Sequence, residues 1–242
     1  MRTLRYETKS GIAVSRTLSK APYRRGLQPL LRKLDRFRGF YLSSGYEYPG
    51  RYSRWDIAAI TPPVEIVSSG RKVDFNPLNA RGEVLCQMLA RAMGKQDFWE
   101  EFQVTGGAIR ATLKPLPAFF AEEERSKQPS VFSVLRALVE EFRHPDDSRL
   151  SLVGAFGYDL LLQFDPIEQK LPRQDVKDLH LYLCDDIYFM DRKTERIERY
   201  QYDFARGDPA TKGLSRAGEK LKRPIFNMLS KWPATSRWSA TV

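Results

Sequence analysis

Residues 180–204 read HLYLCDDIYFMDRKTERIERYQYDF, and this stretch decides the fold class. Two runs rich in aromatic and aliphatic residues, 180–190 and 195–204, flank the polar tetrapeptide 191–194. In the second run alternate positions are aromatic (Tyr200, Tyr202 and Phe204), the period of a strand with one buried face. The pattern predicts two strands joined as an antiparallel hairpin, with the turn at 191–194.

Further strands are expected on the N-terminal side of this hairpin. Residues 3–9 and 12–17 are expected to pair around a Ser-Gly turn, and residues 64–68 and 73–75 around a second turn. Single strands are expected at 40–42 (buried), 52–60 (ended by Pro62-Pro63) and 150–156 (buried). Residues 95–128 have no clear period and are left without an assignment.

Helical periodicity marks three segments between these strands. The segments are 27–34, 84–92 and 130–142, each with apolar residues on one helical face. Ser130 stands where it can cap the third helix, and Gly94 where it can end the second. Strands beside their hairpin partners with helices between them predict an α+β fold, a mainly antiparallel sheet with flanking helices.

The charge distribution argues against a nucleic-acid-binding protein. The net charge of +10 comes from the two ends: residues 1–40 carry 11 Lys/Arg against two acids, and residues 206–242 carry eight against two. Residues 41–205 carry 21 basic against 26 acidic side chains. Nucleic-acid-binding domains concentrate basic and aromatic residues on one face. No such motif occurs here, so no nucleic-acid partner is expected.

Composition also bounds the compartment and the cofactors. No stretch approaches the roughly 18 apolar residues of a membrane span, and the first residues lack the apolar segment of a signal peptide. Cys86 and Cys184 are far apart, and with His144 and His180 they form no metal-ligand spacing. We expect a cytoplasmic protein with no membrane partner, no metal site and no cofactor in this chain.

Two pairs of carboxylates, Asp146-Asp147 and Asp185-Asp186, are the remaining candidates for chemistry. The first pair follows a helix and is expected to be solvated. The second could hold a cation, but adjacent acids at a strand start more often provide one buried cap and one exposed charge. No nucleophile motif or phosphate-binding loop is present, so no catalytic residue is predicted.

Residues 42–56, LSSGYEYPGRYSRWD, hold the best candidate binding site. Hydroxyls, a Pro-Gly turn, arginines and aromatic residues within fifteen positions indicate a segment that binds a small polar molecule. The alternative is a strand, a turn and a second strand whose aromatic residues only pack.

Several short motifs resemble component I of anthranilate synthase, most closely the bacterial type fused to its glutaminase. They are SSGYEYPGRY (43–52), RWD (54–56), NARG (79–82), GAFGYD (154–159) and LCDD (183–186), in the order that the family shows. The resemblance covers roughly residues 4–205. It implies a domain at 1–205 with the fold of that family's N-terminal half. Residues 206–242 are expected to be a linker and an aberrant, disordered tail. Because residues 225–242 no longer resemble the family, we hypothesise that this end is the product of a frameshift or truncation.

The resemblance implies a place in L-tryptophan biosynthesis. The family converts chorismate and glutamine into anthranilate, pyruvate and glutamate, and it binds chorismate and Mg²⁺ in a C-terminal half whose motifs have no match here. This chain alone is therefore predicted to be inactive, with the missing catalytic domain and the glutaminase as partners. The alternatives are a free-standing tryptophan-sensing or glutaminase-docking module, or part of an aminodeoxychorismate or isochorismate synthase.

The resemblance also implies a feedback site for L-tryptophan. Leu42-Ser43-Ser44 aligns with the end of the family's Leu-Leu-Glu-Ser motif, so Ser44 would accept a hydrogen bond from the ligand's ammonium, and Ser43 replaces a glutamate. The further residues assigned to this site are Gly45, Tyr46, Pro49 and Arg54. Tyr46 and Pro49 would face the indole ring, Arg54 aligns with a lysine of some members, and Gly45 could equally be a turn glycine.

The GAFGYD motif carries a second implied role. Phe156, Gly157, Tyr158 and Asp159 are expected at an inter-domain or glutaminase-facing interface. The alternative is a buried strand with tight packing.

Overall fold

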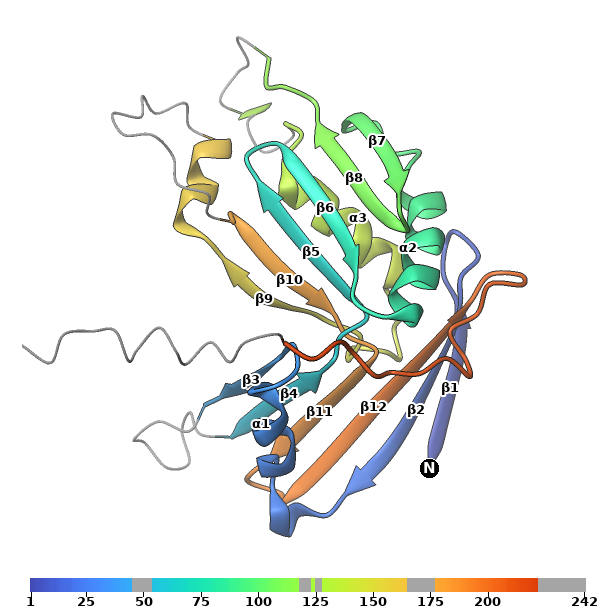
Figure 1. The fold of residues 1–242 in the computed structure, drawn as a ribbon, viewed down its shortest axis with the longest axis vertical. Coiled ribbons are helices and arrows are strands. Elements are labelled where there is room, and N and C mark those ends of the chain that lie inside the picture. Colours follow the sequence, from blue (N-terminus) through green and yellow to red (C-terminus); the bar gives the residue numbers. More distant parts are fainter. Residues whose placement is uncertain (45–53, 118–122, 125–127, 165–176, 222–242) are drawn as a thin grey trace, which may run out of the picture.

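The computed structural model describes residues 1–44, 54–117, 123–124, 128–164 and 177–221. Its strands form two six-stranded antiparallel sheets that meet along a seam (Figure 1). The predicted α+β class with antiparallel strands is confirmed, although the strands divide between two sheets.

The first sheet is built from both ends of the described chain. Its strand order is β1 (Arg2–Glu7), β2 (Ala13–Ala21), β12 (Arg196–Ala205), β11 (Asp186–Asp191), β4 (Trp55–Ile60) and β3 (Gly39–Ser43). The second sheet comes from the middle of the chain. Its order is β7 (Trp99–Thr105), β8 (Ala108–Leu113), β6 (Lys72–Pro77), β5 (Val64–Ser69), β10 (Leu179–Leu183) and β9 (Leu152–Phe156).

Helices cover parts of both sheets. α2 (Ala80–Met93) contacts β5, β6 and β8 of the second sheet, and α3 (Val131–Phe142) lies beside α2 (Figure 1). The shorter α1 (Gln28–Leu34) contacts β3 and β4 of the first sheet. Two short 3₁₀ segments, Tyr23–Arg25 and Tyr158–Gln163, complete the described elements. The three predicted helices are all present.

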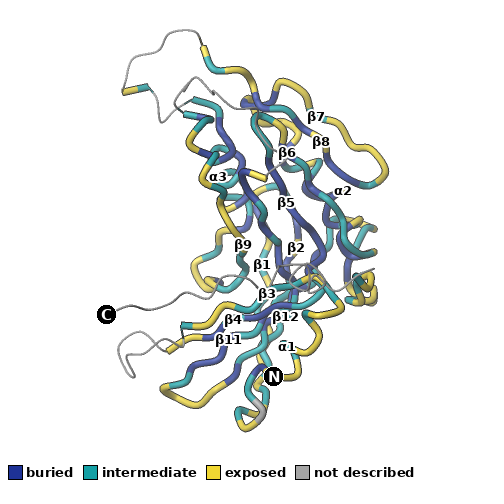
Figure 2. Tube along the Cα trace, turned by 60° about the vertical axis from the view of Figure 1, so that its left-hand side comes forward, coloured by how far each residue is buried: buried dark blue, intermediate teal, exposed yellow. Residues whose placement is uncertain are grey.

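The main hydrophobic core lies between the second sheet and its two helices and continues across the seam into the first sheet. Its fully buried members include Phe75, Leu89, Ile109 and Tyr202. Figure 2 shows the buried positions concentrated along the central strands, while the loops at both ends of the molecule are exposed. A smaller cluster around Leu27 and Met190 lies beneath α1.

The prediction of one strand at 180–190 is wrong. Residues 179–183 form β10 of the second sheet and residues 186–191 form β11 of the first, so the chain changes sheets at Cys184 and Asp185. Both side chains are buried. The predicted hairpin with the next strand exists, and its register pairs Asp191 with Arg196. The sequence does not show this change of sheet, because no glycine or proline separates the two strands. Asp185, which lies between them, is buried in an ion pair and does not form an exposed loop.

The expected burial of two strands is also wrong. β3 and β9 are edge strands, and their outer side chains are exposed: Leu42 by 48% and Phe156 by 53%. A short apolar run does not distinguish a central strand from an edge strand. The unassigned segment 95–128 contains the hairpin of β7 and β8, turned at two glycines with positive φ.

Residues 206–221 run across the seam after β12 (red in Figure 1). Thr211 is fully buried, and the backbone of Leu221 bonds to that of Arg36. The proposed boundary at 205/206 stays a prediction, and residues 222–242 lie outside the described part. Within the described residues, no helix is long and apolar enough to cross a membrane.

Candidate functional site

Ser43 lies at the end of edge strand β3 and contacts a charged pair. Its hydroxyl donates to Asp56 at 2.7 Å, and the Arg192 guanidinium donates to the same hydroxyl at 3.1 Å. Arg192 also donates to both oxygens of Asp56, which is fully buried, at 2.9–3.1 Å. These bonds to Asp56 raise the pKa of Arg192. The negative charge of Asp56 is therefore already paired with Arg192.

Ser44 follows directly and is bonded to the backbone of β4. Its hydroxyl donates to the carbonyl of Trp55 at 2.9 Å and accepts from the Trp55 N–H at 3.0 Å. A hydroxyl offers one donor and two acceptor positions. In this arrangement, Ser44 retains one acceptor position, which suits a ligand N–H and not a ligand carbonyl.

Arg54 directly precedes β4 and pairs with Asp191 at the end of β11. The distance from Nη2 to Oδ2 is 2.8 Å, and the guanidinium lies 4.8 Å from the ring of Trp55. The hydrogen bond from Arg54, supported by the backbone N–H groups of Lys193 and Thr194, holds the pKa of Asp191 well below its usual value. Arg54 thus lies on the same three-strand corner as Ser43 and Ser44.

The remaining tryptophan-site residues, Gly45, Tyr46 and Pro49, lie outside the described residues. A cleft of about 510 Å³ and a smaller cavity of about 170 Å³ are lined by other parts of the chain, not by Ser43, Ser44 or Arg54. The structure therefore brings the three described residues to one corner of the first sheet, and the assignment of a tryptophan site there stays a prediction.

The GAFGYD motif ends edge strand β9 and begins the following 3₁₀ segment. Phe156 stacks on Phe132 yet remains 53% exposed, and Tyr158 is 89% exposed. The backbone of Gly157 packs closely: a Cβ there would lie 2.7 Å from the carbonyl oxygen of Lys177. Asp159 directly follows Tyr158 in the same 3₁₀ segment. The motif therefore combines close backbone packing with an exposed aromatic surface.

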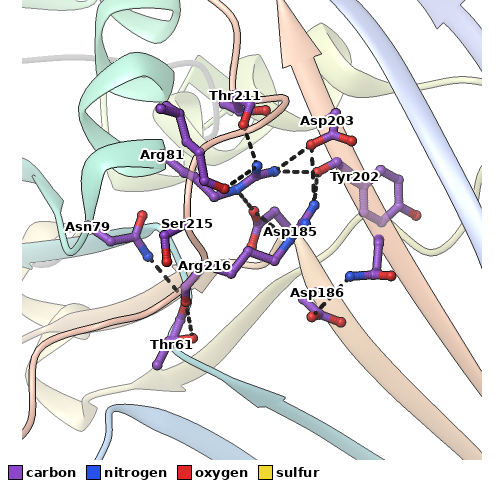
Figure 3. A network of polar contacts seen from close by, with 12 residues as sticks. Thr61, Asn79, Arg81, Asp185, Asp186, Tyr202, Asp203, Thr211, Ser215 and Arg216 are labelled. Carbon is purple, nitrogen blue, oxygen red and sulfur yellow. Dashed lines mark hydrogen bonds and ion pairs between the residues drawn. The ribbon is translucent and has the colours of Figure 1, made fainter.

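A buried polar network at the seam was missed by sequence reasoning. Arg81, fully buried in α2, forms an ion pair with Asp185 at the crossing between β10 and β11 (Figure 3). Its guanidinium also donates to the Tyr202 carbonyl at 2.7 Å, to Asp203 at 3.0 Å and to the Thr211 carbonyl. The NARG and LCDD motifs therefore meet at one ion pair, a pairing that neither motif shows by itself.

Burial has a larger effect on the pKa of Asp185 than its arginine partners have. It raises the pKa of this carboxyl, while Arg81 and Arg216 act in the opposite direction. Asp186 is instead paired with Arg199 at 2.5 Å and stays partly accessible. Within the described residues, no group of three or more His, Cys, Asp or Glu side chains could hold a metal ion.

The expectation for the first carboxylate pair is wrong at Asp147. This side chain is fully buried and accepts hydrogen bonds from Tyr6 and Tyr202, each at 3.0 Å, and from Arg16 at 3.1 Å. Asp146 beside it is exposed, as expected. These three side-chain partners of Asp147 lie more than 50 positions away, so local sequence gave no sign of them.

Comparisons with known proteins agree with the sequence motifs. Anthranilate synthase of Azospirillum brasilense is 41% identical over 219 residues, which cover 89% of this chain and 29% of the relative. Component 1 of anthranilate synthase from Vibrio cholerae is 23% identical over 186 residues (73% of this chain, 35% of the relative). The Serratia marcescens component 1 is 26% identical over 139 residues (57% of this chain, 26% of the relative).

No protein-family model matches the chain. The chain spans about a third or less of the length of these curated relatives. The 41% identity nevertheless extends over most of this chain, including the strands that carry the motifs described above. The chain is therefore homologous to one segment of anthranilate synthase component I, the family that its motifs predicted.

Proposed function

We propose that this chain forms the N-terminal regulatory and structural part of an anthranilate synthase in L-tryptophan biosynthesis. The whole enzyme would convert chorismate and glutamine into anthranilate, pyruvate and glutamate. The 41% identity to the Azospirillum brasilense anthranilate synthase carries this proposal. The groups that bind chorismate and Mg²⁺ would belong to the remaining length of the longer relatives, as would the glutaminase.

An activity assay tests whether the catalytic groups lie outside this chain. Purified chain incubated with chorismate, ammonium and Mg²⁺ is expected to form no anthranilate above a protein-free blank, as followed by anthranilate fluorescence. The Azospirillum brasilense enzyme in the same buffer is the positive control. Turnover that scales with the amount of this chain would show that the catalytic groups are present in it.

The regulatory part of the proposal concerns L-tryptophan at the corner formed by β3, β4 and β11. Ser44 has one acceptor position left for the ligand's ammonium. Asp56 and Asp191 are already paired with Arg192 and Arg54, so neither supplies a free anion. We therefore propose weak tryptophan binding by the chain alone, with the pocket completed by the rest of the longer protein.

A chimera tests this regulatory role directly. In the Azospirillum brasilense enzyme, the aligned segment would be replaced by residues 1–205 of this chain. Anthranilate formation by the chimera is expected to be inhibited by L-tryptophan, and Ser44→Phe is expected to abolish the inhibition without loss of the uninhibited rate. An active chimera that ignores tryptophan, or equal inhibition of the Ser44→Phe variant, would contradict the assignment.

We also propose that the exposed GAFGYD motif forms an interface with the glutaminase or the catalytic part. The support is the exposure of Phe156 and Tyr158 and the position of β9 at the edge of the second sheet in the described part of the chain. In the same chimera, Tyr158→Ala is expected to lower glutamine-dependent activity more than ammonia-dependent activity. Equal loss of both activities would exclude a glutaminase-facing role for this residue.

A further inference from the structure

A cleft of about 510 Å³ at the seam between the sheets has no role in the proposals above. Its walls come from four separate segments: the residue before β3, the link from β4 to β5, the start of α2, and the chain after β12. The lining residues that matter here are Arg38, Pro62, Leu78, Glu83, Gly218 and Glu219.

The wall formed by the chain after β12 is fixed in place. Thr61 donates its hydroxyl to the Arg216 carbonyl at 2.7 Å, as Figure 3 shows, and Asn79 donates to the Thr61 carbonyl at 3.4 Å. Gly218 packs so closely that a Cβ would lie 2.9 Å from the side chain of Thr61. Leu221 then bonds to the backbone just before Arg38. The cleft is thus a built feature with two anchored sides.

Charges of both signs face this cleft. Arg38 donates to Glu65 at 2.8 Å, and its guanidinium has five N–H donors, so this contact leaves donors over. Glu83, in the first turn of α2, and Glu219, in the chain after β12, also line the cleft; both are exposed and make no ion pair within the described part of the chain. Pro62 and Leu78 contribute apolar surface to the same lining.

We propose that the seam cleft binds a small zwitterion, an α-amino acid with an apolar side chain. Its carboxylate would meet Arg38, its ammonium would lie between Glu83 and Glu219, and its side chain would pack on Pro62 and Leu78. A simple anion would face two carboxylates, and a simple cation would make no use of the N–H donors of Arg38 that its pair with Glu65 leaves free. The cleft volume lies within the roughly 300–1,000 Å³ of small-molecule sites.

This cleft is separate from the corner proposed for tryptophan. Arg38 precedes the first residue of β3, where Gly39 pairs with Ile60, whereas Ser43 at the other end pairs with Asp56. The two sites thus lie at opposite ends of the same edge strand. Their tests are independent, because a substitution at Ser44 leaves the lining of the cleft unchanged.

Titrations of the full 242-residue chain with three related probes test the proposal. The probes are L-leucine, isoamylamine (leucine without its carboxylate) and 4-methylpentanoate (leucine without its ammonium). Saturation-transfer NMR is expected to show saturable binding of L-leucine and at least tenfold weaker binding of either analogue, because each analogue lacks one charge-assisted contact. Equal binding of leucine and one analogue, or no saturable binding of leucine, would overturn the proposal.

Variants locate the binding. The double variant Glu83→Gln with Glu219→Gln is expected to weaken L-leucine binding about tenfold or more, and Gly218→Val is expected to weaken it by displacing one wall. Glu101→Gln, an exposed carboxylate on β7, is the matched control and is expected to have no effect. Ser44→Phe is expected to have none either. Binding that survives the double variant, or is lost in Ser44→Phe, would place leucine elsewhere and refute this assignment. Circular dichroism of each variant checks the fold.

Discussion

Replacing Arg81 by Met is expected to remove much of the stability of this domain. The Arg81 side chain is 1% exposed and that of its partner Asp185 is 2% exposed. Removing one member of a buried pair costs about 3–5 kcal/mol. Asp185 would keep only the partly exposed Arg216 at 3.4 Å, so the lower end of this range is expected. The whole free energy of unfolding of a domain is about 5–15 kcal/mol. The variant should therefore unfold at a clearly lower urea concentration than the wild type.

A second substitution separates the charge from the other contacts of Arg81. In the double variant Arg81→Met with Asp185→Leu, no buried charge is left unpaired, so part of the loss should be recovered. The recovery is expected to be incomplete, because the Tyr202 and Thr211 carbonyls still lose their donor, at about 1–3 kcal/mol. Urea unfolding followed by circular dichroism at pH 7 measures all three proteins.

The pH dependence of this loss follows from Asp185. Burial raises its folded-state pKa, so its contribution to stability is full below the unfolded value and is lost as pH rises through the folded value. Without Arg81, which lowers this pKa, the folded value rises further. The difference between wild type and Arg81→Met should therefore shrink as pH falls from 7 toward about 4. A cost below about 1 kcal/mol at pH 7, or one that does not change with pH, would refute this reasoning.

Three further predictions concern other parts of the fold. Arg54→Gln is expected to lower the thermal midpoint at pH 7, and melts at decreasing pH should show the difference shrinking. The reason is that Arg54 depresses the pKa of Asp191, a contribution present above the unfolded value and lost as pH falls through the folded value. Gly82→Ala is expected to cost about 1–3 kcal/mol or more in urea unfolding, because the new Cβ would lie 2.0 Å from the Pro63 carbonyl oxygen; a cost near zero would contradict this packing. Asn79→Ala is expected to cost about 1 kcal/mol by removing the cap of α2, whereas Asn79→Asp, which keeps the acceptor and loses only the 3.4 Å bond to the Thr61 carbonyl, should lower the melting temperature less.

Sequence reasoning recovered the elements whose pattern is local. α2 and α3 have a repeated apolar face and follow the N-cap residues Asn79 and Ser130, and the hairpin of β5 and β6 has a Gly turn between two apolar runs. Such periodicities depend on residues within one or two turns of each other. They are readable without knowing which element packs on which.

The division into two sheets depends on contacts that local patterns do not contain. The run at 180–190 appears to be one strand in the sequence. Its division at Asp185 depends on the ion pair with Arg81, more than 100 positions earlier, which no local pattern shows. The candidate site shows the same limit: Ser43, Ser44 and Arg54 were chosen from a local motif, while Arg192, which joins Ser43 to Asp56, comes from the hairpin after β11. Only the strand order shows that these segments are adjacent.

The nested strand order has a consequence for synthesis on the ribosome. All of the second sheet lies in sequence between β4 and β11, which are neighbours in the first sheet. Ala59 pairs with Ile187, so β4 cannot pair with β11 until 128 further residues have been synthesised. At about 5–20 residues per second, this delay is roughly 6–26 s. During that time the nascent first sheet has an open edge at β4, so its protection from misassociation depends on how early the inserted sheet and its helices fold.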